Sequence, residues 1–114
     1  MIVSSTGENL HVKNWNVDSP KAQIFLVHGY AEHISRYKPL AKKLNKEGFS
    51  VIGHDHAGHG KSGGERAYIE RFDQYVWDLK RVMDEYKVED VPQFLFGHSM
   101  GGLIVTSYCT LYRP

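Results

Sequence analysis

A short run near the carboxyl end of the chain combines a serine with glycines at a spacing that suits nucleophilic chemistry. The run reads Gly97-His98-Ser99-Met100-Gly101-Gly102. A serine at a sharp strand-to-helix turn is held in a strained backbone conformation that lifts its hydroxyl clear of the sheet, so its close neighbours must be small. Gly97 and Gly101 meet that need, and Ser99 is therefore a candidate nucleophile. The alternative is a glycine-rich turn whose serine is incidental.

The residues on either side of this run predict the elements that such a turn requires. An apolar strand pattern over residues 94–96 precedes the run, and a helical pattern over residues 103–112 follows it. The backbone N–H of Met100 then lies at the start of the helix, where it and the positive end of the helix dipole can face an oxyanion. The sequence thus predicts half of an acyl-transfer site.

Two more apolar runs, residues 24–27 and 49–52, are nearly continuous like the run at 94–96, which is typical of strands covered on both faces. A helix is predicted between these two, within residues 35–47, with Ser35 as its N-cap and Gly48 as its stop. The apolar stripe of that helix consists of Pro39, Leu40, Ala41 and Leu44.

A second helix is predicted between the second and third apolar runs. Charged residues fall mostly off its apolar stripe, among them Asp78, Lys80 and Arg81, and the stripe itself consists of Phe72, Val76, Leu79, Met83 and Tyr86. Strands alternating with helices predict an α/β fold with parallel strands. Residues 10–15 alternate instead and predict a half-exposed antiparallel strand or hairpin at the sheet edge, and residues 53–64 predict an extended glycine-rich loop.

Composition limits the classes of protein to consider. The chain has 114 residues, 41% of them hydrophobic, which is enough for one compact domain at most. Its formal net charge of +1 gives no strong positive field that would attract nucleic acid. A single cysteine, Cys109, fits a reducing compartment, and no run approaches the length of a membrane span. We expect a cytoplasmic or peripheral membrane protein.

Three groups of motifs, in order and at matching spacing from about Asn9 onward, carry a family resemblance. They are His28-Gly29 with Glu32-His33 and Arg36-Tyr37, then Asp55-His56-x-Gly58-His59-Gly60-x-Ser62-x-Gly64-x-Arg66, then the run from Gly97 to Gly102. Together they resemble the monoglyceride lipase group of α/β-hydrolases. The resemblance implies the α/β-hydrolase fold, with neighbouring strands ending at His28 and His98. It also implies a serine esterase that acts without a cofactor on monoacylglycerols or related lipid esters such as lysophospholipids.

The same resemblance implies a role for each matching residue. Ser99 would be the nucleophile, and the backbone N–H groups of Met100 and Tyr30 would bind the oxyanion. Supporting positions would be His28 and Gly29, which shape the loop presenting Tyr30, with Asp55, His56 and His59 beneath the site and Gly97, His98 and Gly101 around the serine. Position 30 departs from the family, which usually has a small residue there, so the phenol would narrow the acyl site or point away from it.

In that family the catalytic Asp and His follow the serine in the chain. Here none of the residues after Ser99 is Asp, Glu or His, and the family's cap is also missing. We therefore interpret residues 1–114 as the amino-terminal portion of a single α/β-hydrolase domain, with any peripheral membrane contact made by the cap. Alone, this portion is expected to be nearly inactive and prone to aggregate through the 94–96 strand. Oligomeric state and acyl-chain preference stay open.

Other functions compete for the same residues. His54, His56 and His59 come close to a metallo-hydrolase zinc pattern, but Gly58 stands where an Asp ligand is needed, so hydrogen bonding within the loop is favoured and no metal is expected. Gly60-Lys61-Ser62 resembles a phosphate-binding loop, yet Asp55 replaces the glycine that begins one. A base-stacking platform of aromatic residues is disfavoured relative to core packing; its members would be Tyr68, Phe72, Tyr75 and Trp77.

The resemblance also leaves other classes of function open. A different α/β-hydrolase activity, such as that of a peptidase, thioesterase or acyltransferase, would use the same Ser99 chemistry. A non-catalytic α/β module that binds a partner through an incomplete sheet would not. Labelling of Ser99 by a fluorophosphonate separates the catalytic readings from the non-catalytic one.

Overall fold

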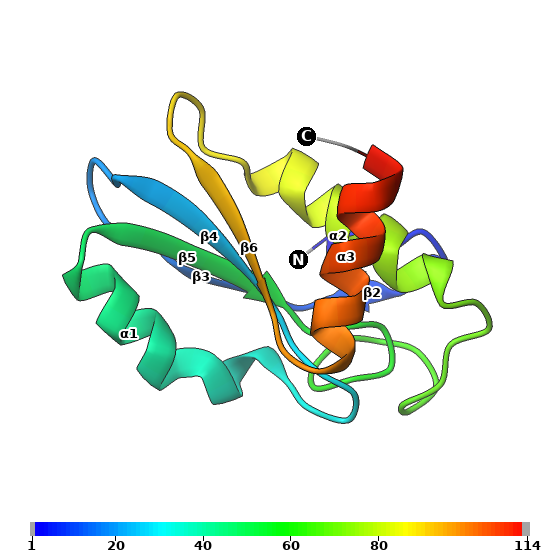
Figure 1. Ribbon diagram of the computed structural model, residues 1–114. Coiled ribbons are helices and arrows are strands. Elements are labelled where there is room, and N and C mark those ends of the chain that lie inside the picture. The colour runs from blue at the N-terminus through cyan, green and yellow to red at the C-terminus, as the bar shows by residue number, and fades with distance from the viewer. Residues whose placement is uncertain (1, 113–114) are drawn as a thin grey trace.

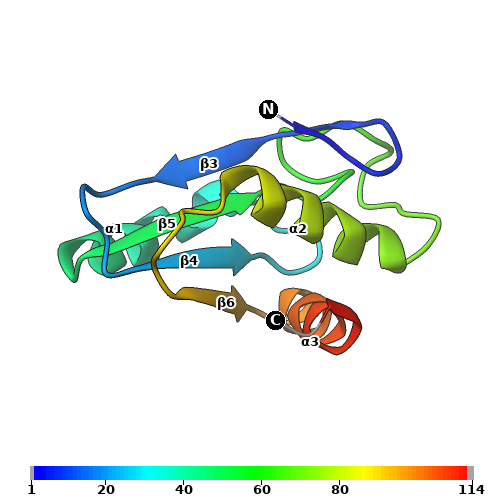
Figure 2. The ribbon, with the colours of Figure 1, turned by 90° about the horizontal axis from the view of Figure 1, so that it is seen from above.

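The computed structural model describes residues 2–112. Within that range the main sheet has four strands, whose spatial order is β3 (Val12–Trp15), β5 (Phe49–His54), β4 (Ala22–Val27) and β6 (Gln93–Gly97) (Figure 1). β4 pairs in parallel with both β5 and β6, and β3 runs antiparallel to β5. The predicted parallel strands are confirmed, and so is the antiparallel edge near the amino terminus. Seen from above, β3 and β6 lie at opposite edges of this sheet (Figure 2).

Helices cover the two faces of the sheet unequally. The 3-10 helix η1 (Ile34–Tyr37) leads into α1 (Lys38–Lys46), which packs on one face with a small core. α2 (Asp73–Tyr86) and α3 (Met100–Tyr112) cover the other face over a larger core. Side chains alternate along β4, so that Phe25 and Val27 enter the larger core and Leu26 enters the smaller one.

A two-stranded hairpin, β1 (Ile2–Val3) with β2 (Asn9–Leu10), precedes the main sheet. α2 anchors this hairpin through Asp78, whose Oδ1 accepts hydrogen bonds from the N–H of Ser5 at 2.8 Å and from its hydroxyl at 2.9 Å. Asp78 is 1% exposed, so its expected place off the buried stripe is wrong. Burial raises its pKa above the usual value.

The predicted helices are present, with shifted ends. Ser35 does not cap α1, because it lies inside η1, and the residue before α1 is Tyr37, which makes no side-chain cap. Pro39 is exposed at the first turn of α1, where its missing N–H costs nothing, and does not belong to the apolar stripe. Gly48 does follow the helix end, with a φ of 92° that favours glycine. α3 begins at Met100, three residues earlier than the apolar pattern indicates.

The strand β6 differs from the expectation of cover on both faces. Phe94 is 57% exposed and Phe96 46% exposed, while Leu95 packs against the larger core. The reason is position, since β6 is the outer strand and α1 packs on the part of the sheet made by β3, β4 and β5. None of the helices within residues 2–112 has the length and apolarity needed to cross a bilayer.

Candidate active site

Ser99 sits at a turn so tight that its backbone is left-handed. Its φ is 56°, and the residue is exposed. The turn closes because strand and helix approach without side chains between them: a Cβ on Gly97 would overlap the carbonyl oxygen of Gly101, and a Cβ on Gly101 would overlap that of Val27. The two glycines therefore permit the strained serine, as the sequence predicted.

The loop after β4 lies directly beside this turn. Val27 on β4 pairs with Gly97 on β6, and the N–H of His98 donates to the carbonyl of Val27 at 3.2 Å. The strands that end at His28 and His98 are thus neighbours, as expected. A Cβ on Gly29 would lie 3.4 Å from Cβ of Ser99 and 3.2 Å from the carbonyl oxygen of His98. Glycine at position 29 thus suits the close approach of the two loops, because a larger residue would have to push its neighbours aside.

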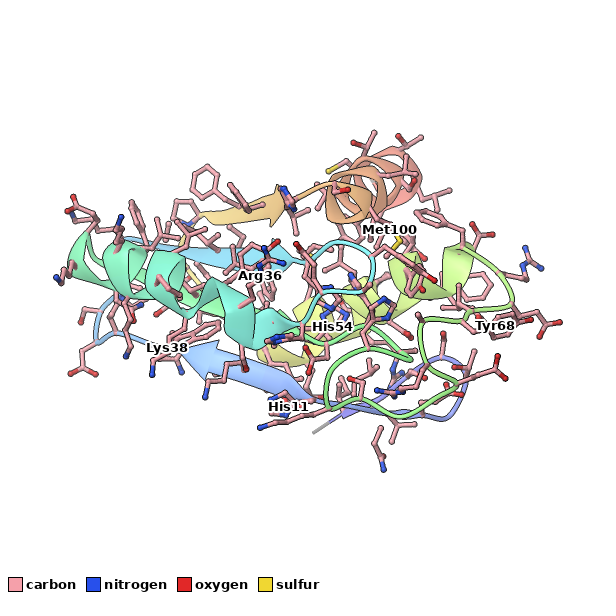
Figure 3. All side chains as sticks on the ribbon, turned by 90° about the horizontal axis from the view of Figure 1, so that it is seen from below. His11, Arg36, Lys38, His54, Tyr68 and Met100 are labelled. Carbon is pink, nitrogen blue, oxygen red and sulfur yellow. The ribbon has the colours of Figure 1, made fainter. Side chains whose placement is uncertain are left out.

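Two backbone donors in these loops are free to receive a ligand. Met100 is the first residue of α3, and the Tyr30 N–H belongs to the loop after β4 (Figure 3 labels Met100 at the helix start). Among the residues that the structure describes, neither N–H has a hydrogen-bond acceptor. Free amides at a helix start and in an adjoining loop can stabilise a developing negative charge.

Glu32 holds the loop after β4 in place. Its Oε1 accepts hydrogen bonds from the N–H of Gly29 at 2.8 Å and from the hydroxyl of Tyr37 at 2.7 Å. Its Oε2 lies 3.4 Å from the guanidinium of Arg36 and 3.7 Å from Nδ1 of His98. These hydrogen bonds, that of Tyr37 foremost, lower the pKa of Glu32 below its usual value, while burial raises the pKa of Tyr37 to about 12. The sequence motif contained Glu32, but only the structure shows that its carboxylate is an anchor.

A pair of buried histidines ties the same loop to the loop after β5. Nε2 of His28 accepts the N–H of His56 at 3.0 Å, so the ring proton of His28 is on Nδ1, which donates to the carbonyl of Gly29 at 2.7 Å. In return, Nε2 of His56 donates to the carbonyl of His28 at 2.8 Å. Burial lowers the pKa of His28 to about 4 and lowers the pKa of His56 as well. Both rings are therefore neutral cross-links between loops.

The other two histidines of the zinc-like pattern, in which no metal is expected, lie in two environments. His59 donates from Nδ1 to the carbonyl of Ala57 at 3.0 Å, in agreement with the expected hydrogen bonding within the loop. His54 is 1% exposed, and in the described part of the chain neither of its ring nitrogens has a partner. Burial lowers the pKa of His54 to about 3. Figure 3 shows His54 in the interior, away from the start of α3.

Asp55 organises the rest of the loop after β5. Its carboxylate accepts the N–H of Ile34 at 2.6 Å and the N–H of Lys61 at 2.9 Å, and its main-chain carbonyl accepts the hydroxyl of Ser62 at 2.6 Å. A phosphate-binding loop would offer the Lys61 N–H to its ligand, but here Asp55 occupies that donor. Asp55 is therefore a structural brace.

The four aromatic residues considered as a base-stacking platform differ in how far they are buried. Tyr75 is buried and Phe72 packs against the larger core, as predicted. Tyr68 is 54% exposed and Trp77 37% exposed, so the prediction of core packing is wrong for these two. They lie outside the core because Tyr68 is in the loop before α2 and Trp77 faces away from the stripe that α2 buries.

The side chain of Tyr30 crosses from one loop to the other. Its hydroxyl donates to the carbonyl of Ala67 at 2.8 Å, and the residue is 56% exposed. The next residue, Ala31, has a φ of 61°, a left-handed conformation that costs an alanine about 1 kcal/mol. Sequence reasoning did not find this contact, because the acceptor is a main-chain carbonyl that no side-chain pattern reveals.

Within residues 2–112, no side chain accepts a hydrogen bond from the Ser99 hydroxyl. Nearby acidic and basic groups have other partners: Glu32 binds Gly29 and Tyr37, and the rings of His28, His56 and His59 bind main-chain groups. The described arrangement thus provides an exposed hydroxyl and two free amides.

Comparison with known proteins agrees with this geometry. The family described as serine aminopeptidase, S33, matches residues 18–114. Monoglyceride lipase of Rattus norvegicus is 42% identical over 106 residues, which are 90% of this chain and 35% of the rat protein, and a Bacillus subtilis phospholipase is 35% identical over 87% of this chain and 38% of its own length. The chain therefore spans little more than a third of these relatives.

Solved structures agree in fold. Monoacylglycerol lipase of Paleococcus ferrophilus superposes with a TM-score of 0.77 at 36% identity, over 90% of this chain and 38% of that one. The chain belongs to the serine aminopeptidase S33 family and has the fold of the amino-terminal part of an α/β-hydrolase.

Proposed function

We propose that the complete protein containing this chain is a serine hydrolase that cleaves carboxylic esters of lipids, with monoacylglycerols or lysophospholipids as substrates. The observation that carries the proposal is the left-handed, exposed Ser99 beside two free backbone amides. The lipases and the phospholipase among its relatives support a lipid ester as substrate. Such amphiphilic substrates suit an enzyme of the cytoplasm or of a membrane surface, where a cap would make the membrane contact.

In the proposed reaction, the Ser99 oxygen attacks the acyl carbonyl carbon while a histidine takes the hydroxyl proton. The N–H groups of Met100 and Tyr30 bind the negatively charged oxygen of the tetrahedral intermediate. When that intermediate collapses, the bond to the alcohol breaks and the alcohol leaves with the proton from the histidine. Water then attacks the acyl-enzyme by the same route and releases the fatty acid and the free serine.

The histidine and its acidic partner are proposed to lie outside residues 1–114, which then form the amino-terminal portion of one catalytic domain. The two cross-linked histidines of the chain are poor candidates for the base. His28 and His56 are bound to each other's main chain, and burial lowers the pKa of both. Without a base, an unassisted serine hydroxyl is a weak nucleophile near neutral pH.

Labelling with a fluorophosphonate tests this proposal, because the reagent reacts only with an activated serine. The complete protein should be labelled at Ser99, and the Ser99→Ala variant should not be labelled. Ser107→Ala, on the helix α3 that follows Ser99, is the matched control and should be labelled like the unmodified protein. A folded complete protein that is not labelled would contradict the enzyme proposal and favour a non-catalytic binding module.

The family description also favours a second candidate, hydrolysis of a peptide bond by the same serine. The acyl-enzyme chemistry is the same for an ester and an amide, so the site geometry alone does not separate them. Initial rates of the complete, unlabelled protein on monoacylglycerols and on aminoacyl amides would do so. We expect the lipid esters to be the faster substrates.

A further inference from the structure

The side chain of Tyr30 connects the two loops beside Ser99. Its hydroxyl donates to the carbonyl of Ala67 at 2.8 Å, and the edge of its ring meets the ring of His59, with centroids 5.5 Å apart and an interplanar angle of 77°. We propose that Tyr30 is a positioning residue: its phenol latches the loop after β4 to the loop after β5 and so fixes the direction of its own backbone N–H. This inference rests on the proposed function, which assigns that N–H to the oxyanion.

The loop that receives the phenol is firmly held. The N–H of Ala67 donates to the carbonyl of Gly58 at 2.8 Å, and the N–H of Gly58 donates to the carbonyl of Gly63 at 2.8 Å. The guanidinium of Arg66 adds hydrogen bonds to three further carbonyls in the loop, those of Gly60, Ser62 and Gly64. The carbonyl of Ala67 is therefore a fixed point to which another loop can be attached.

The loop that carries the phenol has a strained section just where the latch acts. Ala31 is left-handed, and the turn around it is closed by a long hydrogen bond of 3.3 Å from the N–H of Glu32 to the carbonyl of Gly29. His28 and the Glu32 carboxylate anchor the loop as far as Gly29. The Gly29 carbonyl and the Tyr30 N–H belong to one planar peptide group, so the bond from His28 restrains this amide from one side. The bond from the Tyr30 hydroxyl to Ala67 restrains the same residue from the other side, next to the strained Ala31.

The latch also uses a feature that sets this chain apart from the family pattern of a small residue at position 30. A small side chain there could not reach the loop after β5. The ring of Tyr30 lies against His59, which is 3% exposed, so the phenol has a buried surface to rest on as well as a hydrogen-bond acceptor. The cost of holding an exposed side chain in one orientation is thereby reduced.

The test compares Tyr30→Phe with Tyr68→Phe in the complete protein. Both remove one hydroxyl from a tyrosine that is more than half exposed, but only Tyr30 donates to Ala67. The rate of fluorophosphonate labelling at Ser99 should fall about fivefold in Tyr30→Phe, the loss expected for one hydrogen bond, and should not change in Tyr68→Phe. With an ester substrate kcat should fall while KM stays constant, because the Tyr30 amide acts on the transition state.

Hydrogen exchange provides a readout that needs no activity. In Tyr30→Phe, peptides covering residues 28–33 should exchange faster than in the unmodified protein, and Tyr68→Phe should leave them unchanged. If Tyr30→Phe is labelled at the original rate, the latch is overturned and the hydrolase proposal stands. If the unmodified protein is not labelled at all, the hydrolase proposal fails, and unchanged exchange in Tyr30→Phe would then refute the physical latch separately.

Discussion

The loops around Ser99 and the outer edge of the sheet are built in opposite ways. Around Ser99, polar groups are buried and paired: the carboxylate of Asp55 is 2% exposed and holds two backbone N–H groups, and His28 and His56 are cross-linked. At the outer edge, large apolar side chains of β6 and α3 face solvent, namely Phe94, Phe96, Leu103 and Leu111. The first region is preorganised by its own contacts, whereas the second is an apolar surface that water does not stabilise.

The largest expected effect comes from the contact between strand and helix at the elbow. Gly101→Val should destabilise the fold by about 3 kcal/mol and abolish labelling of Ser99, because the new side chain overlaps the main chain of Val27 and His28. Gly102→Ala is the matched control: its Cβ would lie 3.5 Å from the nearest carbonyl oxygen, in ordinary contact. Urea unfolding should show Gly102→Ala to be as stable as the original or slightly more so. Equal losses in both variants would refute the close-contact explanation.

The buried brace at Asp55 comes next. Asp55→Asn should cost about 2 kcal/mol, because an amide group must replace a carboxylate oxygen that now accepts a backbone N–H. Asp90→Asn, at an exposed position whose φ of 67° asparagine tolerates, should change the free energy of unfolding little. Chemical denaturation of the two variants measures the difference. A cost at Asp55 no greater than at Asp90 would show that the brace contributes nothing.

The buried histidines predict a pH dependence of stability. A histidine whose pKa is lower in the folded state remains neutral there, while the unfolded chain takes up a proton near pH 6.5. Stability should therefore fall as the pH drops from about 6.5, by about 1.4 kcal/mol per pH unit for each such histidine, until the folded pKa is reached. For His54 that window extends down to about pH 3, and for His28 down to about pH 4.

His54→Phe isolates one part of that pH dependence. It removes a titrating ring that has no partner within residues 2–112. The loss in free energy of unfolding between pH 6 and pH 5 should therefore be about 1.4 kcal/mol smaller in this variant. Denaturant midpoints at the two pH values give the slopes. An unaltered slope in His54→Phe would mean that its ring is already protonated in the fold.

The smallest effect on stability is expected at the outer edge. In the isolated 114-residue polypeptide, Phe94→Lys should change the free energy of unfolding by about 0.5 kcal/mol or less, since the ring is 57% exposed, yet it should raise solubility. Leu95→Lys, its neighbour facing the larger core, should instead destabilise the fold. Light scattering and thermal unfolding distinguish the two. If Phe94→Lys aggregates as readily as the original polypeptide, the exposed edge is not the cause of association.

Much of the fold could be predicted because its signals are local. The strands β4, β5 and β6 and the apolar stripe of α2 could be predicted from hydrophobic patterning. The glycines at 97 and 101 indicate a close approach of strand and helix that no larger residue allows. Helix ends were less predictable. Ser35 has the right chemistry for a cap, but a 3-10 turn that includes it comes before α1, so the helix begins elsewhere.

The sequence did not predict which individual polar and aromatic residues are buried. Asp78 lies on α2 at a position that a charged residue normally exposes, and it is buried only because the hairpin of β1 and β2 folds back over it. Tyr68 and Trp77 are aromatic like core residues, yet they are 54% and 37% exposed. For Asp78, the deciding neighbour is far away in the chain.

The sequence by itself determined that a strained serine would follow an apolar strand, because glycine spacing and apolar periodicity are properties of consecutive residues. Tertiary structure alone decided that Gly29 lies against Ser99, that Glu32 and His28 hold that loop, and that the phenol of Tyr30 reaches Ala67. The contacts of Gly29 with Ser99 and of Tyr30 with Ala67 join loops that only the pairing of β4 with β5 and β6 brings together, and the hydrogen bonds end on main-chain atoms. Main-chain donors and acceptors are the same in every residue, so no sequence pattern can mark which of them will meet.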